Sequence, residues 1–417
     1  MARQKRTNNG LRPRPKQHYF VLALNIFVVI SLISAGLSLL WVNGRISQRL
    51  VVTLNNAKKS AKPLSDEITS GTDWNLDTQS LDAKNFLLTG SDNGACTNSN
   101  SKISGGIGDR TNFGERSDTI MIIRIDPSSK RAAILSFPRD LWVDIAGTTR
   151  QNRINSAFKS TDPNRLVTTI EENFNIPIDH YVNINFCAFK EIVTAVDGVK
   201  VPFLFPTRDK QTGLNVTAPG CINFDGDTAL AYVRSRSGYR YFNTTKQKWE
   251  EDPTGDLGRI SRQQDFLRRS MQRALDKGSS SLSVANNLLN AALKNVITDD
   301  QLTPRDMLTL AQAMRDLNTR TVATYTIESY PKRIGEMSVL IPSIKSETMQ
   351  QILGIFQGRT SLTVQGAAMH KTEDLKIQLI SQRTVMSKTM SPTTTIPNTT
   401  PSQKTVGVVP PNDPACR

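Results

Sequence analysis

Arginines recur in three short strings that lie far apart in this 417-residue chain. The strings read SFPRD at residues 136–140, YVRSR at residues 232–236 and DLGRISRQQ at residues 256–264. A guanidinium group stays charged at any physiological pH and binds phosphate oxygens two at a time. Several such groups that converge from distant segments would surround a polyanion. The strings therefore predict a pocket for a phosphate or diphosphate group.

The last string is expected to begin a helix that spans residues 258–276. At about 100° per residue, Arg259, Arg262 and Gln263 lie on one stripe of this helix. A second stripe, about a quarter turn away, is apolar and contains Ile260, Leu267, Met271 and Ala274. Such a helix would pack in the core and still hold two arginines and an amide over a pocket, where its N-terminal N–H groups would add to anion binding. The alternative is a solvated basic face, because three further arginines follow on the same helix.

The remaining candidate arginines precede this helix. Arg234 and Arg236 alternate on a segment that is expected to be extended, so both side chains would point to one face. Two adjacent like charges repel unless an anion or solvent lies between them, and the alternative is an exposed strand with scattered charges. Arg139 follows an apolar strand at residues 131–137, and ligand groups gather at strand ends in α/β folds. Arg153 is a fifth candidate for the same anion.

Carboxylates matter because a diphosphate usually binds together with Mg²⁺, which prefers oxygen ligands. Asp92 and Asp118 each lie at the boundary of an expected strand and are the predicted pair of metal ligands. Asp109 competes for the same role. For each aspartate taken singly, the alternative interpretation is a helix cap or a turn residue.

The elements that must position these residues are a mixture of strands and helices. The expected strands cover residues 85–89, 118–125, 131–137, 180–184 and 321–327, and the expected helices cover residues 164–174, 185–196, 258–276, 284–297, 304–317 and 347–357. The run at residues 118–125 is almost continuously apolar, as in a sheet that is covered on both faces. This order predicts an α/β fold, an α-β-α sandwich around a central mixed sheet. Beyond residue 198 the sequence predicts mostly helix.

The first 80 residues predict a membrane anchor and a stalk. Residues 1–18 carry six basic side chains and no acid, and the 24 residues 19–42 carry no charge. A helix of this length crosses a hydrocarbon core of about 30 Å, with its basic end in the cytoplasm. A cleaved signal peptide is the alternative, although its apolar region would span only about 7–15 residues. Residues 43–80 are polar and are expected to form a stalk, so the rest of this single-pass protein would be extracellular.

Composition limits the partners. The chain has 52 Lys and Arg against 37 Asp and Glu, a formal net charge of +15. Nucleic acid is disfavoured as the anionic partner, because aromatic residues make up only 6% of the chain and the basic strings would lie outside the cell. Only His180 and His370 follow the predicted anchor, which disfavours a Ser-His-Asp hydrolase. The Thr- and Pro-rich residues 384–417 are predicted to be disordered, because they contain few large apolar groups.

Four cysteines fit an oxidising compartment. Cys187 and Cys221 flank the Asp-Gly-Val segment at residues 197–199 and are predicted to pair. Cys96 and Cys416 would pair with each other, stay free or bond to another chain, and the sequence leaves these options open.

Six strings resemble motifs of the LytR-CpsA-Psr family and occur in the order found in that family. The strings are GERSDTIM at 114–121, LSFPRDLWV at 135–143, RINSAF at 153–158, VDGV at 196–199, DGDTALAYVRSR at 225–236 and DLGRISRQQ at 256–264. The resemblance spans roughly residues 85–275 and implies a catalytic domain at residues 81–360. It implies a membrane-bound, Mg²⁺-dependent glycopolymer-phosphate transferase that moves a glycopolymer from a polyprenyl diphosphate carrier onto peptidoglycan.

The resemblance also implies roles for individual residues. The implied diphosphate-binding residues are Arg139, Arg153, Arg234, Arg236, Arg259 and Gln263. Arg139 and Arg259 would act in catalysis, and Arg259 and Gln263 are favoured over Arg262. Asp118 would hold Mg²⁺ with Asp92, and either Asp256 or Asp118 would accept the proton of the attacking hydroxyl group. The loop between Asp92 and Asp118 and the segment 237–255 depart from the compact family pattern.

The lipid carrier requires an apolar tunnel. Strands 118–125 and 130–137 and the helices after residue 258 would line it, although the same residues would otherwise form an ordinary core. Two other functions fit the same pocket. One is a phosphatase that hydrolyses polyprenyl diphosphates, and the other is a scaffold that binds lipid-linked polymer without chemistry.

Overall fold

The computed structural model covers most of the predicted catalytic domain. The structure describes residues 49–55, 82–91, 117–280, 282–362, 409–411, 413 and 416. The described residues from Leu50 onward form one compact unit. The predicted anchor at residues 19–42 and the metal candidates Asp92 and Asp109 lie outside the described residues. No helix in the described part of the chain is long and apolar enough to cross a membrane.

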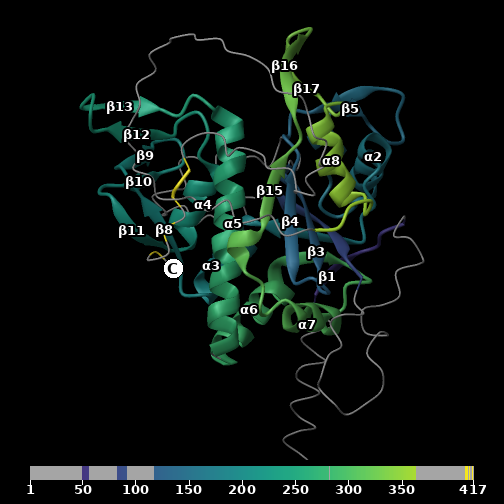
Figure 1. The fold of residues 1–417 in the computed structure, drawn as a ribbon, viewed down its shortest axis with the longest axis horizontal. Coiled ribbons are helices and arrows are strands. Elements are labelled where there is room, and N and C mark those ends of the chain that lie inside the picture. Colours follow the sequence, from purple (N-terminus) through teal and green to yellow (C-terminus); the bar gives the residue numbers. More distant parts are fainter. Residues whose placement is uncertain are drawn as a thin grey trace, which may run out of the picture. The chain divides into compact units, whose positions relative to one another are not determined.

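A seven-stranded mixed sheet forms the centre of this unit (Figure 1). In spatial order its strands are β1 (Leu50–Val52), β14 (Val296–Asp299), β7 (His180–Asn185), β2 (Lys84–Ser91), β3 (Ser117–Asp126), β4 (Arg131–Ser136) and β15 (Ala323–Thr326). The pairs β1–β14, β2–β7 and β4–β15 are parallel, and the other three pairs are antiparallel. The predicted central mixed sheet is confirmed.

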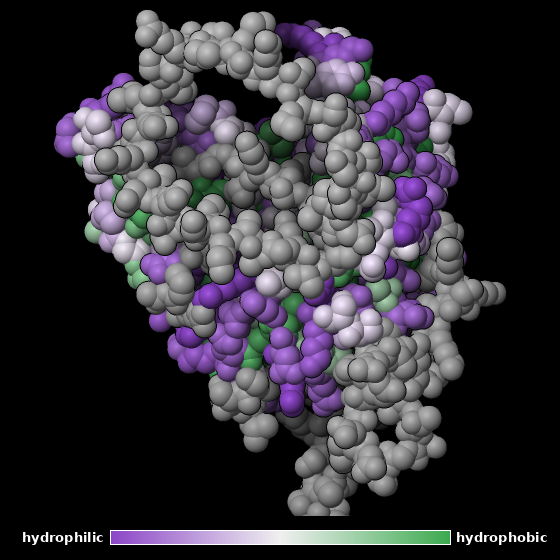
Figure 2. Space-filling model, viewed as in Figure 1, coloured by the Kyte–Doolittle hydropathy of each residue, from purple (hydrophilic) through white to green (hydrophobic). Residues whose placement is uncertain are grey.

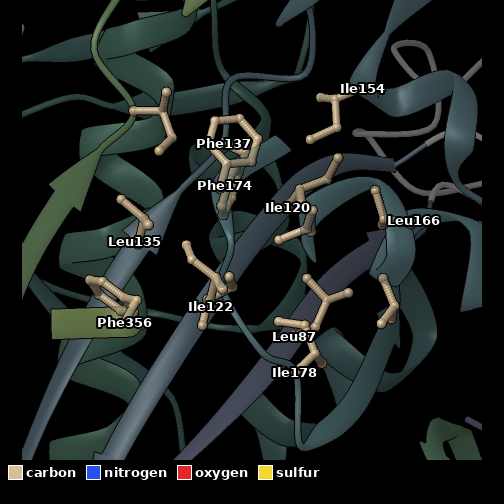
Figure 3. Packing of buried hydrophobic residues seen from close by; sticks show 14 of the residues in the cluster. Leu87, Ile120, Ile122, Leu135, Phe137, Ile154, Leu166, Phe174, Ile178 and Phe356 are labelled. Atoms are coloured by element: carbon tan, nitrogen blue, oxygen red, sulfur yellow. The ribbon is translucent and has the colours of Figure 1, made fainter. Parts of the chain in front are cut away.

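Helices cover both faces of the sheet. Successive residues of a strand point to opposite sides, and in the central strands both sides carry apolar residues that must be buried. Ile122 and Leu135 enter a core that includes side chains of α2 (Asn164–Phe174) and α8 (Glu347–Phe356), as Figure 3 shows. Their neighbours Met121 and Ile134 enter a second cluster on the opposite face. There Leu267 of α5 (Gly255–Ser280) and Leu310 of α7 (Pro304–Ala313) pack against them. This alternation gives the α-β-α layering.

Local sequence signals explain where these helices begin and end. Helix α2 starts after Pro163 and ends at Asn175, which adopts the left-handed conformation that terminates many helices. Helix α7 starts with a capping box between Thr303 and Asp306 and carries Pro304 in its first turn. These signals account for the agreement between the predicted and observed helices. The remaining two, α3 (Phe186–Ala195) and α6 (Leu282–Asn295), also form near their predicted positions.

The prediction of mostly helix beyond residue 198 is wrong for residues 199–251. Residues 199–251 form six short strands and one helix around a separate apolar core. They are β8 (Val199–Phe203), β9 (Thr207–Asp209), β10 (Leu214–Val216), β11 (Gly220–Phe224), α4 (Gly226–Arg234), β12 (Arg240–Asn243) and β13 (Lys248–Glu251). Phe224, Tyr232 and Phe266 meet in this core and join α4 to α5. Strands of three to five residues are too short for hydrophobic periodicity to reveal them.

Several other short elements also escape prediction. They are β5 (Trp142–Asp144), β6 (Gln151–Arg153), η4 (Ile154–Ala157), η5 (Thr319–Thr321), β16 (Ser329–Ile334) and β17 (Met337–Pro342). Strand β1, inside the predicted stalk, and strand β14, which overlaps the end of the predicted helix at residues 284–297, also escape prediction. Strands β16 and β17 form a two-stranded hairpin. Its second strand contacts β5, where Leu340 N donates a hydrogen bond to Asp140 O at 2.9 Å. The hairpin therefore supports the loop that follows β4.

A disulfide joins Cys221 of β11 to Cys416, 195 residues further along the chain. The predicted Cys187–Cys221 bond is therefore wrong, although Cys187 is itself in a disulfide. Cys96 lies outside the described residues. Arg269 Nη2 of α5 also donates a hydrogen bond to Pro411 O at 2.8 Å. The described end of the Thr- and Pro-rich tail is thus attached to the folded unit.

Candidate active site

Five elements bring six of the predicted site residues together. Arg139 follows β4, Arg153 ends β6 and Arg236 lies two residues beyond α4. Asp256 and Arg259 are on the first turns of α5. On the sheet side, Asp118 near the start of β3 completes the group. Residues separated by up to 141 positions in sequence therefore surround one place in the fold.

Asp118 lies between two arginines. Arg139 Nη1 donates a hydrogen bond to Asp118 Oδ1. Arg259 Nη2 donates to the backbone oxygen of Asp118 at 2.9 Å, and its Nη1 lies 3.6 Å from Asp118 Oδ2. The carboxylate and carbonyl of one residue thus fix the directions of both guanidinium groups.

Two further aspartates extend this network. Asp256 Oδ1 lies 3.0 Å from Arg236 Nε and 3.0 Å from Arg259 Nη2. Asp140 contacts Arg153 at 3.3 Å, Arg139 at 3.5 Å and Arg236 at 3.8 Å. Four guanidinium groups therefore face three carboxylates, which leaves one positive charge in excess. A bound anion could take the place of one carboxylate without a change in the positions of the guanidinium groups.

Burial and charge act in opposite directions on the two central arginines. Burial lowers the pKa of Arg259, whose side chain is 4% exposed, although Asp256 and Asp118 oppose this change. For Arg139, burial also acts to lower the pKa, but attraction to Asp118, Asp256 and Asp140 outweighs it and raises the pKa. Arg259 Nε is buried and makes no hydrogen bond to the described residues. A phosphate oxygen would satisfy such a donor.

The predicted geometry of Arg234 is wrong. Arg234 is the last residue of α4, not part of an extended segment, and the backbone turns at Ser235 before Arg236. The two arginines therefore do not alternate along a strand. The Arg234 guanidinium carbon lies 4.9 Å from the ring centroid of Phe186. Gln263 Nε2 donates to Val233 O at 3.1 Å, which fastens α5 to this end of α4.

Arg262 has a structural role. Its side chain and that of Asp252 are both 0% exposed, and Arg262 Nη1 lies 2.7 Å from Asp252 Oδ2. Arg262 Nη2 donates to Ser235 O at 2.9 Å, and its guanidinium carbon lies 3.9 Å from the ring centroid of Tyr239. The alternative of a solvated basic face is thus wrong for this residue. The geometry agrees with the preference for Arg259 over Arg262, because Arg259 lies in the network around Asp118. The binding role of Gln263 stays a prediction.

Sequence reasoning missed Asp140 as the carboxylate that joins three arginines. The only signal was its position directly after Arg139. It also missed the support from β17, where Ser338 O accepts a hydrogen bond from Arg153 Nη2 at 2.9 Å. A partner 185 residues away leaves no local pattern.

The described residues supply one of the two predicted metal ligands. Asp118 offers carboxylate oxygens, and its side chain is 33% exposed, which suits an ion that keeps several waters. Among the residues that the structure describes, no group of three or more His, Cys, Asp or Glu side chains is arranged to hold a metal ion. The Mg²⁺ site therefore stays a prediction, because Asp92 lies outside this part of the chain.

Comparison with known proteins identifies the fold and the family. The sequence profile of the LytR_cpsA_psr family matches residues 49–353, well over half of the chain. This chain belongs to the LytR-CpsA-Psr family. The match includes all four arginines of the network and Asp118, Asp140 and Asp256.

Relatives of known name cover part of the chain. The polyisoprenyl-teichoic acid–peptidoglycan teichoic acid transferase TagU of Enterococcus faecalis is 35% identical over 184 residues. The matched region is 44% of this chain and 55% of TagU, so it spans little more than half of that relative.

Two solved structures share the fold of this LytR-CpsA-Psr protein. A LytR-Csp2A-Psr enzyme from Actinomyces oris has a TM-score of 0.51 at 22% identity, with 66% of this chain and 89% of that chain covered. TagT bound to LIIa-WTA has a TM-score of 0.51 at 22% identity, with 74% of this chain and 98% of that chain covered.

Proposed function

We propose that this protein transfers a glycopolymer from a polyprenyl diphosphate carrier onto peptidoglycan. The observation that carries the proposal is the arginine network around Asp118, Asp140 and Asp256. Its surplus positive charge and preset guanidinium directions suit a diphosphate. The name of the TagU relative, which specifies a polyisoprenyl-linked donor and a peptidoglycan acceptor, supports the same reaction.

In the proposed reaction, a peptidoglycan hydroxyl oxygen attacks the phosphorus atom that carries the glycopolymer. A new P–O bond forms to the acceptor, the bond from that phosphorus to the bridging oxygen breaks, and polyprenyl phosphate leaves. The hydroxyl proton passes to Asp118 or Asp256. Arg139, Arg236 and Arg259 neutralise the charge on the diphosphate and on the leaving phosphate. Arg153, Arg234 and Gln263 complete the proposed binding site.

An apolar region beside the network is the proposed site of the lipid chain. Leu87 and Ile122, on one face of the sheet, are fully buried. On the other face Leu88, Ile123 and Ile125 are only partly buried, although they belong to a cluster that also contains side chains of α5 and α7. Partly buried side chains of α5 pack against the same cluster, namely Leu267, Met271 and Leu275. This looser face fits the predicted tunnel lined by strands β3 and β4 and the helices after residue 258.

The proposed enzyme is a single-pass membrane protein with its N-terminus in the cytoplasm and its catalytic domain outside. The basic residues 1–18 and the uncharged residues 19–42 support this arrangement. A polyprenyl diphosphate also resides in a membrane, so an anchored enzyme would meet its donor there.

Mg²⁺ is proposed as the cofactor, held by Asp118 and Asp92. When bound, it would neutralise part of the diphosphate charge. Treatment of the protein with EDTA is expected to lower the transfer rate by about 10²-fold or more, and added Mg²⁺ should restore it. Asp118→Asn should raise the Mg²⁺ concentration needed for half-maximal rate, whereas Asp144→Asn, at an exposed position, should not. An unchanged rate in EDTA would remove Mg²⁺ from the proposal.

A transfer assay with product analysis tests the function. The full-length protein in detergent is given a radiolabelled polyprenyl-diphosphate glycopolymer and purified peptidoglycan. The proposal predicts label in the peptidoglycan and release of polyprenyl phosphate. Free labelled polymer with no label in peptidoglycan would indicate the phosphatase, and recovery of intact donor would indicate the scaffold. Either result would contradict the proposed transfer.

A further inference from the structure

A second group of basic side chains surrounds a hollow beside the C-terminal half of α5. Five cations from three elements line it, namely Lys200, Arg268, Arg269, Arg273 and Arg320. They come from β8, α5 and η5. Figure 2 shows mostly hydrophilic residues over the lower half of α5, where grey atoms do not cover it. None of these five residues belongs to the network around Asp118.

Three of the five cations are held rigidly. Asp265 is buried and accepts hydrogen bonds from Arg268 Nη2 at 2.7 Å and from Arg269 Nε at 2.8 Å. One carboxylate therefore serves two guanidinium groups. Arg273 Nε donates to the carbonyl oxygens of Val196 at 3.1 Å and Gly198 at 3.2 Å. These contacts fix the arginines without neutralising all of their charge.

The other two cations, Lys200 and Arg320, form no ion pair with the described residues. Lys200 is partly buried on β8, and Arg320 is exposed on η5. Asp276 and Asp413 also line the hollow. Asp197 also lies 3.7 Å from Arg273 Nη2 and 3.6 Å from Lys277 Nζ. With Asp197, Asp265 and Lys277 included, six cations face four carboxylates, which leaves an excess of two positive charges. The hollow is therefore suited to an anion.

The C-terminal residues build one wall of this hollow. Cys416 is 3% exposed and lines it while bonded to Cys221. Arg269, another lining residue, binds Pro411 O through its Nη2 atom. A disulfide between distant segments therefore holds this wall in place. Such a covalent bond favours a defined site over an incidental surface depression.

We propose that this hollow binds a phosphodiester group of the glycopolymer whose diphosphate occupies the first site, an inference that rests on the proposed function. Helix α5 carries residues of both sites. Arg268 and Arg273 follow Arg259 by 9 and 14 positions, about 14 and 21 Å along the axis at about 1.5 Å per residue. A short polymer segment spans this length. The second site would select phosphate-bearing polymers and hold them while the diphosphate reacts.

Binding of a lipid-free poly(glycerol phosphate) oligomer to the full-length protein, measured by calorimetry, tests the inference. The oligomer lacks a diphosphate, so it reports on the second site. Lys200→Gln combined with Arg320→Gln should weaken binding about tenfold or more, because two charges are lost. The matched pair Arg150→Gln and Lys159→Gln removes two exposed charges elsewhere and should leave the affinity unchanged. Unchanged binding by the first pair would overturn the inference.

Four further comparisons distinguish the possible anionic ligands from one another and the second-site proposal from the proposed function. Cys221→Ser with Cys416→Ser should also weaken oligomer binding, because the wall is released. Inorganic phosphate should bind at least about tenfold more weakly than the oligomer, since it occupies only one subsite. A phosphate-free peptidoglycan fragment that bound as tightly as the oligomer would contradict the assignment. Arg139→Ala should lose transfer but keep oligomer binding, so failure of one proposal is distinguishable from failure of the other.

Discussion

Arg139→Ala should reduce kcat/KM for polymer transfer by about 10²–10³-fold or more, the loss expected when a preorganised donor to a developing anion is removed. Arg139 contacts Asp118 and Asp140 at the centre of the network, and its side chain is 23% exposed. Because it is not deeply buried, its removal should leave the unfolding midpoint nearly unchanged. The kcat/KM of Arg139→Lys should lie between those of Arg139→Ala and the unchanged protein, since lysine keeps the positive charge but lacks the planar guanidinium group.

The control for this experiment is Arg150→Ala, an exposed arginine beyond β5. Its transfer rate should equal that of the unchanged protein. Arg259→Ala should also abolish transfer, but Arg259 is buried beside Asp256, so its folding must be measured as well. Transfer at the normal rate by a folded Arg139→Ala protein would remove the network from the proposed chemistry.

The largest effect on stability is expected from Arg262→Met. This change leaves the fully buried Asp252 carboxylate without its ion-pair partner. Loss of one member of a buried pair typically lowers the free energy of unfolding by about 3–5 kcal/mol. The measurement is urea unfolding followed by circular dichroism.

Arg268→Met is the matched control on the same helix. Its partner Asp265 keeps the hydrogen bond from Arg269, so the cost should be only about 1 kcal/mol. Arg262→Met with Asp252→Asn should recover part of the lost stability, because no buried charge remains unpaired. An Arg262→Met protein of normal stability that had lost diphosphate binding would place Arg262 in the site instead.

The arginines of helix α5 differ in role because their side chains contact different parts of the fold. Arg259 points toward β3 and Arg262 toward the segment after α4. Arg268 and Arg269 lie beside the C-terminal wall. Composition alone makes these residues look equivalent. The family resemblance favours Arg259 over Arg262, and the neighbours brought by the fold give the physical reason.

Sequence reasoning succeeded where the signals were local and long enough. The apolar strand β3 and helix α2, with proline before it and Asn175 after it, follow from periodicity and capping. The expected convergence of Arg139, Arg236 and Arg259 is confirmed by the contacts that they share with Asp118, Asp140 and Asp256. Charged motifs of this kind can be recognised before the fold is known.

The failures concern features that depend on distant partners. Arg234 was expected on a strand, but burial of Tyr232 against Phe224 and Phe266 stabilises a helix there. The Cys221–Cys416 bond joins residues 195 positions apart, which sequence proximity cannot predict. Asp140 acquires its role only because β6 and the end of α4 bring Arg153 and Arg236 to it.

Native mass spectrometry of the full-length protein, purified in mild detergent from the cells that produce it, tests the central claim most directly. The arginine network predicts a bound polyprenyl diphosphate, with or without attached sugars, whose mass identifies both phosphates. Arg139→Ala combined with Arg236→Ala should purify without it, whereas Arg150→Ala should retain it. Recovery of the same lipid with the double variant, or of no diphosphate lipid with the unchanged protein, would contradict the account.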